Sequence, residues 1–168
     1  MRFAYYGGAL GVLASATAWL VAGLVSAWYS SERAVWALFI GGMFIHPAAV
    51  LLNKAIGRPG NHTRGNPLGP LAWASTVWLM LSLPLAYSVS LLRIDWFFPA
   101  MLLVIGGRYL TFSTLYGMRI YWLCGATLAI AAYLLVLAHA SPSLGAATGA
   151  AIEALFALAI IILTRRAG

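Results

Sequence analysis

Residues 120–140 read IYWLCGATLAIAAYLLVLAHA, an apolar run that contains no Asp, Glu, Lys or Arg. A helix of about 20 apolar residues is long enough to cross the roughly 30 Å hydrocarbon core of a membrane. Similar runs, separated by short polar breaks, recur along the chain. We therefore expect an all-α protein, a polytopic membrane helix bundle that forms one transmembrane domain over residues 1–168. Its six predicted transmembrane helices lie at about 3–29, 34–57, 71–92, 96–118, 120–140 and 144–163.

The composition of the whole chain agrees with a membrane protein and excludes an ordinary soluble domain. Of the 168 residues, 63% are hydrophobic and only 8% are charged, whereas a soluble domain carries about 25% charged residues. Ten basic and three acidic residues give a net charge of +7. Because these bases separate apolar runs instead of gathering on one water-facing surface, we do not expect nucleic-acid binding.

Cysteine and histidine give no sign of a redox or metal centre. Cys124 is the only cysteine, so there is no intramolecular disulfide and no CxxC pair. The three histidines lie far apart, without the HxxxH or HExxH spacing of zinc sites. We therefore expect no metal and no other cofactor. A membrane enzyme is the weaker hypothesis, because the acids form no catalytic pair and no Ser or Cys accompanies a His in a recognisable motif.

Basic residues predict the orientation of the chain. Short cytoplasmic loops are enriched in Lys and Arg. In a six-span protein, one side would carry only Arg33 and Arg93, each near an acid. We therefore predict that both termini are cytoplasmic and that the protein lies in the inner (plasma) membrane. The cytoplasmic side would carry Arg2, Lys54, Arg58, Arg64, Arg119, Arg165 and Arg166.

Three ionisable residues stand out inside predicted spans, away from the span ends: His46, Arg108 and Glu153. Ionisable groups at such positions cost roughly 2.5–3.5 kcal/mol on insertion scales, so each needs a partner or a function. Their spans run in the same direction, and the three residues lie at depths of about 18, 18 and 14 Å from the outer ends. The sequence therefore predicts a polar cluster near the bilayer midplane, with an ion pair between Arg108 and Glu153.

Several interpretations of this cluster stay open. The ion pair either contributes to a binding site or only fixes two helices together, and Arg108 could instead extend to the inner interface. His46 is interpreted as a core histidine bonded to the backbone carbonyl that Pro47 frees. Glycines four and eight residues before Glu153, at positions 149 and 145, predict that its face packs against protein. Such glycine faces could also support a homodimer.

Polar side chains beside Arg108 suggest the wall of a cavity. Tyr109 and Thr111 can donate hydrogen bonds there, although threonine also satisfies itself on its own helix. This cavity would open toward the cytoplasmic loop 58–70, in which Arg64, Asn66 and Pro67 form a candidate loop motif.

Three pieces of sequence resemble a family of small uncharacterised bacterial multi-pass membrane proteins. They are IHP at 45–47, RGNPL at 64–68 and GRYLTFSTLYGMRIY at 107–121. That family has an Asn-Pro-Leu loop motif before a span and a later Gly-x-His-Phe stretch, where this chain has Arg108 in place of the histidine. The resemblance implies a location in the bacterial inner membrane and brings no function with it.

Two functional hypotheses follow from the sequence. In the first, the protein binds or transports a small molecule or a membrane lipid at the midplane cluster, with Arg108 on an anionic group and Glu153 or His46 coupling protons. In the second, it is a non-catalytic accessory or structural membrane subunit, whose buried ion pair only fixes helix packing.

Overall fold

The computed structural model describes residues 1–166 except 62 and 64, and this part of the chain is all helical. Six long helices follow one another without a strand among the described residues, and each is long and apolar enough to cross a membrane. A short turn of 3-10 helix precedes α1 (η1, Tyr6–Gly8) and another precedes α4 (η2, Ile94–Trp96). The long helices are α1 (Ala9–Trp28), α2 (Ser31–Ala55), α3 (Gly69–Leu92), α4 (Phe97–Tyr116), α5 (Ile120–Leu137) and α6 (Pro142–Arg166).

Glycine residues with positive φ angles lie at two of the helix ends. The first α-helix begins at Ala9, later than the predicted 3, because Tyr6, Gly7 and Gly8 have φ values of +51°, +66° and +84°. These are left-handed conformations that a right-handed helix cannot contain. Gly117, at φ +64°, ends α4 in the same way. The turn between α4 and α5 therefore starts two residues before Arg119, where the break was predicted. By contrast, α2 continues through Pro47.

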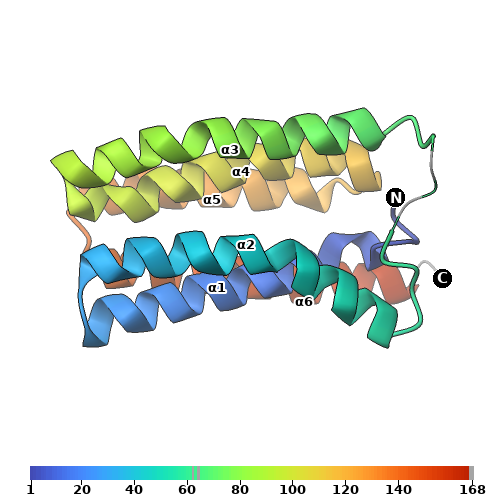
Figure 1. Cartoon of the computed structure of the whole chain (residues 1–168), viewed down its shortest axis with the longest axis horizontal. Coiled ribbons are helices and arrows are strands. Elements are labelled where there is room, and N and C mark those ends of the chain that lie inside the picture. Colours follow the sequence, from blue (N-terminus) through green and yellow to red (C-terminus); the bar gives the residue numbers. More distant parts are fainter. Residues whose placement is uncertain (62, 64, 167–168) are drawn as a thin grey trace.

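The helices form two groups of three that lie against each other (Figure 1). In one group α1 packs against α2 and α6, and in the other α4 packs against α3 and α5. The groups join mainly where α6 meets α5 and α4. Both termini and the loop between α2 and α3 lie at one end of the bundle, here called the terminal end (Figure 1).

Large apolar side chains cover much of the outside of the bundle. On α3 only Ser75, Ala86 and Ser90 are buried, while Trp78, Leu81 and Leu85 are 59–70% exposed. Apolar surface of this extent is not typical of a protein that is surrounded by water. Together with the lengths of the helices, it indicates a multi-pass membrane protein.

Close contacts at glycine hold helices together, both inside the groups and between them. A Cβ atom added at Gly106 of α4 would lie 2.9 Å from the carbonyl oxygen of Gly125 on α5, and one added at Gly125 would lie 2.6 Å from that of Gly106. On α6, Gly145 faces Phe98 and Gly149 faces Trp19, so the predicted protein-packed glycine face is confirmed. Because Gly145 and Gly149 are buried within the chain, they offer no free surface to a second copy.

Gly106 and its neighbour Gly107 provide a matched test of this packing. We expect Gly106→Val to lower the stability of the purified protein by about 1–3 kcal/mol, since the new side chain would overlap α5. A Cβ at Gly107 meets nothing within 4 Å, so Gly107→Val should have little effect. Thermal unfolding in detergent measures both variants, and equal losses would contradict the close approach of α4 and α5.

Candidate functional site

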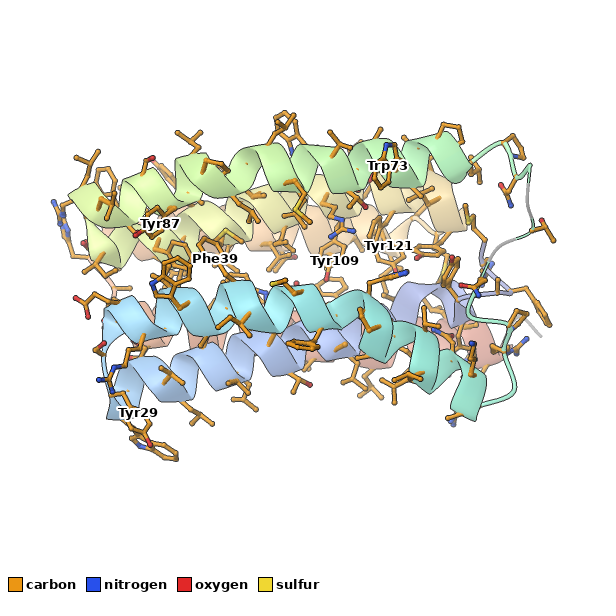
Figure 2. All side chains as sticks on the ribbon, viewed as in Figure 1. Tyr29, Phe39, Trp73, Tyr87, Tyr109 and Tyr121 are labelled. Atoms are coloured by element: carbon orange, nitrogen blue, oxygen red, sulfur yellow. The ribbon has the colours of Figure 1, made fainter. Side chains whose placement is uncertain are left out.

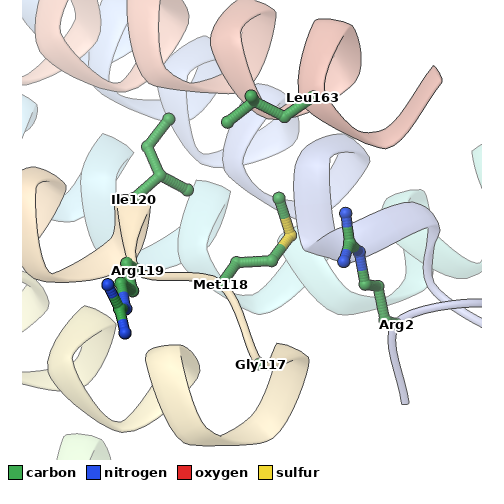
Figure 3. A pocket seen from close by; sticks show the side chains of 6 residues that line it. All are labelled: Arg2, Gly117, Met118, Arg119, Ile120 and Leu163. Atoms are coloured by element: carbon green, nitrogen blue, oxygen red, sulfur yellow. The ribbon is translucent and has the colours of Figure 1, made fainter. Parts of the chain in front are cut away.

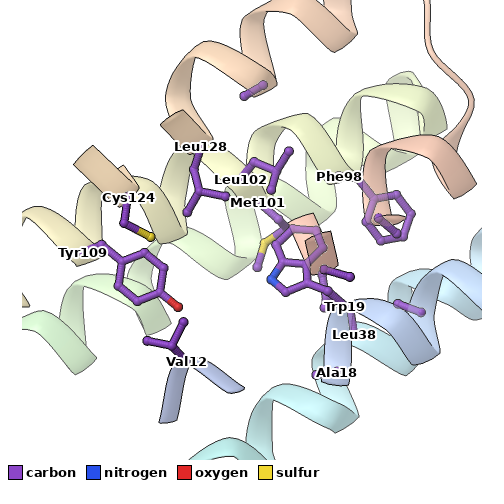
Figure 4. Close-up of a cluster of buried hydrophobic side chains, with 14 of the residues drawn as sticks. Val12, Ala18, Trp19, Leu38, Phe98, Met101, Leu102, Tyr109, Cys124 and Leu128 are labelled. Carbon is purple, nitrogen blue, oxygen red and sulfur yellow. The ribbon is translucent and has the colours of Figure 1, made fainter. Parts of the chain in front are cut away.

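Glu153 is completely buried in the bundle, with an exposed fraction of 0%. It stands one turn after Gly149 on α6, and the absent side chain at Gly149 lets Trp19 of α1 pack directly against the α6 backbone. Figure 4 shows the apolar side chains of this core, with Trp19 and Tyr109 among them. Glu153 therefore lies in the centre of the protein, where a polar group needs a partner.

That partner is Tyr109 of α4. Its hydroxyl donates a hydrogen bond of 2.9 Å to the Oε1 atom of Glu153. From α1, Ser15 and Trp19 approach the same carboxyl group, but Oε2 has no hydrogen bond of ordinary geometry. Tyr109 lies between the two groups of helices, as does Tyr121 (Figure 2). The carboxyl group thus sits where α1, α4 and α6 meet.

Arg108 points away from this centre, and the predicted ion pair with Glu153 is wrong. Among the described residues the only N–O pair of opposite charge within 4.0 Å joins Arg93 to Asp95. Successive residues of a helix are separated by about 100°. Since Tyr109 faces α6, the preceding residue is turned toward α3. The residue of α4 that meets Glu153 is therefore Tyr109, the neighbour of Arg108.

The contacts of Arg108 are all with uncharged groups. Its Nε atom donates a hydrogen bond of 3.3 Å to the Oγ atom of Ser75 on α3. Its guanidinium carbon lies 5.3 Å from the centre of the Phe112 ring, in the range of a cation–π interaction. The side chain is partly buried. Among the described residues, Arg108 has no carboxylate oxygen within 4.0 Å of its nitrogen atoms.

His46 is not a buried histidine with a hydrogen bond to a freed carbonyl, so that interpretation is wrong. It is exposed, and no hydrogen bond from it is found in the described part of the chain. His46 therefore lies outside the core, whereas Glu153 is fully buried within it.

The remaining candidates have local roles. The hydroxyl of Thr111 donates to the backbone oxygen of Arg108 at 2.7 Å, which satisfies it on its own helix. Asn66 accepts a hydrogen bond of 2.9 Å from the backbone N–H of Leu68, and Pro67 lies inside this turn that leads into α3. Arg64 lies outside the described residues. Asn66 and Pro67 therefore shape the entry to a helix.

Sequence reasoning missed Ser15, Trp19 and Ser75, the uncharged neighbours of the two ionisable groups. Serine in a span usually satisfies itself on its own helix, so nothing in the sequence separated Ser75 from the other serines of α3. An aromatic cluster was missed as well. Phe112 packs against Tyr109, Tyr116 and Tyr121 with ring centres 5.5–5.7 Å apart.

Comparison with known proteins places the chain in a family. The model of the Family of unknown function (DUF7010) matches residues 1–163. The chain belongs to this family. No curated protein matches the chain, and no solved structure matches it.

This member of the DUF7010 family has no evident metal centre among the residues that the structure describes. No group of three or more His, Cys, Asp or Glu side chains lies close enough to hold an ion there. The ionisable and hydroxyl groups inside the bundle include one carboxyl group, one guanidinium group, the buried thiol of Cys124 and several hydroxyl groups. Such groups are able to form hydrogen bonds, and the guanidinium group also carries a charge.

A double-mutant cycle tests the partner of Glu153. Tyr109→Phe removes the donor to Oε1, and we expect it to cost about 0.5–3 kcal/mol, because a buried acceptor loses its hydrogen bond. In a Glu153→Gln background the same change should cost a different amount, giving a coupling energy between the two sites. Arg108→Gln should show a smaller coupling to Glu153→Gln. Chemical unfolding of the three single and two double variants measures both couplings, and a larger coupling for the arginine would reverse the assignment.

Proposed function

We propose that the protein binds a small anionic molecule or the acidic group of a lipid inside the membrane, at Arg108. The observation that carries this proposal is a guanidinium group in an apolar helix whose contacts are one serine hydroxyl and one aromatic ring. A charge inside a membrane span is costly and usually has a counter-ion or a function. The chain provides no acid in contact with it among its described residues.

Arg108 has the chemistry of a ligand-binding group. Guanidinium presents five donors in a planar fork that suits carboxylate and phosphate, and only Nε is engaged by Ser75. The surface of α4 beside it is open, since Gly107 is exposed and a Cβ there would meet nothing within 4 Å. A ligand moving within the bilayer could therefore reach this level of α4 from the outside of the bundle.

A fatty acid and its uncharged analogue test the proposal. We expect oleate to stabilise the purified protein against thermal unfolding more than oleyl alcohol, because only oleate carries an anionic group. Arg108→Gln should weaken oleate binding by about tenfold or more, the loss of a charge-assisted hydrogen bond. Arg33→Gln, at the end of the bundle opposite the two termini, is the matched control. Equal binding of oleate by the Arg108 and Arg33 variants would disprove the proposal.

A second candidate function rests on Glu153. Its complete burial and its hydrogen bond to Tyr109 favour a carboxyl group that fixes the register of α1, α4 and α6. That arrangement suits an accessory subunit of a membrane complex. Co-purification of a stoichiometric partner from native membranes, without stabilisation by oleate, would favour it.

We also propose that both termini are cytoplasmic and that the membrane is a bacterial inner membrane. The excess of Lys and Arg at the terminal end supports this orientation. The opposite end contains the ion pair of Arg93 with Asp95.

Cysteine labelling tests the orientation. The native Cys124 is buried, so it should react slowly. We expect a membrane-impermeant maleimide to label Ser141→Cys in intact cells, because residue 141 is exposed at the end opposite the termini. Asn61→Cys, in the loop between α2 and α3, should react only after lysis. The reverse pattern would place both termini outside.

A further inference from the structure

A shallow, widely open cavity of about 370 Å³ lies at the terminal end of the bundle, between the start of the chain, the α4–α5 turn and the end of α6. Figure 3 shows how two arginines from distant parts of the sequence stand on its rim, with apolar side chains behind them. Neither the Arg108 region nor the Glu153 region contributes to it. The cavity is lined by Arg2, Gly117, Met118, Arg119, Ile120 and Leu163.

The two arginines of this cavity are free to bind an anion. In the described part of the chain neither side chain forms an ion pair or a hydrogen bond. The Asp and Glu side chains are too far away to neutralise them: Glu32 in the first turn of α2 and Asp95 in η2 are at the opposite end, and Glu153 is enclosed in the core. Two unpaired guanidinium groups beside one cavity are typical of a phosphate-binding surface.

The rest of the lining is apolar and continues onto the outside of the bundle. Met118 is buried behind the arginines, whereas Leu163 is 42% exposed on α6. Ile120 starts α5 at the same level. A ligand that fits this cavity therefore has a negatively charged head and hydrocarbon that can lie along α5 and α6.

We propose that this cavity binds the phosphate headgroup of an anionic phospholipid, with Arg2 and Arg119 on the phosphate and Ile120 and Leu163 against the acyl chains. Basic pockets between membrane helices, next to the headgroup layer, recognise lipids in this way. The terminal end also contains Arg165, whose Nε atom donates to the hydroxyl of Tyr6 at 3.2 Å. Its positive charge adds to the attraction for an anionic headgroup.

The experiment compares three probes on the full-length protein in a neutral detergent. Dioleoyl phosphatidylglycerol should raise the unfolding temperature more than dioleoyl phosphatidylcholine, and inorganic phosphate alone should not reproduce the effect. The double variant Arg2→Gln/Arg119→Gln should bind phosphatidylglycerol about tenfold or more weakly. Arg33→Gln/Lys54→Gln removes the same net charge away from the cavity and should bind as the wild type does.

Three results would overturn the proposal. Equal stabilisation by the two phospholipids would mean that the headgroup charge is not recognised. An equal effect of inorganic phosphate would make the site one for a free anion. An equal loss of affinity in both double variants would mean that overall charge, not the cavity, attracts the lipid.

A cavity-filling variant keeps the test independent of the arginines. Leu163→Trp places a larger side chain on the wall and retains both charges, so it serves even where the double variant fails to fold. Loss of selectivity for phosphatidylglycerol in this variant supports the cavity as the binding site. Unchanged selectivity would contradict it.

Discussion

The hydrogen bond between the Tyr109 hydroxyl and the Glu153 carboxyl crosses from one group of three helices to the other. It depends on two features of α6 and α1: the glycine at position 149, which admits the indole of Trp19, and the serine one turn before that indole. In a low-dielectric interior an unsatisfied carboxyl group is expensive. The rotations of α1, α4 and α6 must therefore all bring their polar side chains to the same point.

That constraint also explains where Arg108 lies. Because Tyr109 faces α6, the preceding residue, Arg108, must face a different helix. That helix is α3, where Ser75 accepts its hydrogen bond. The two costly ionisable groups of the chain are thus separated by the geometry of one helix. One is enclosed and shared among three helices, while the other is partly exposed beside an open stretch of α4. A structural role fits the first, and ligand binding fits the second.

Basic and acidic residues are distributed unevenly between the two ends of the bundle. The terminal end has many bases and none of the three Asp and Glu side chains, and the opposite end has the ion pair of Arg93 with Asp95. Two of the bases that indicate orientation, Arg2 and Arg119, also line a cavity with apolar walls. A positive end that only set topology would not need such a cavity, and the combination of both is what a headgroup-binding site requires.

The amino-acid sequence by itself determined the helices and the placement of charge along them. Runs such as 120–140 are too long and too apolar for any other structure, and the short breaks leave no room for a further domain. The position of Glu153 along its helix, level with the middle of α4, also followed from the sequence, because the rise per residue of a helix is fixed. The rotation of each helix about its own axis could be known only from the packed structure. The apolar residues of α4 are distributed around its whole circumference, so no hydrophobic stripe in the sequence shows which neighbour Arg108 faces and which one Tyr109 faces. The partner of Glu153 follows from the rotations of α1, α4 and α6, and the packing at Gly106, Gly125 and Gly149 helps to fix those of α4 and α6.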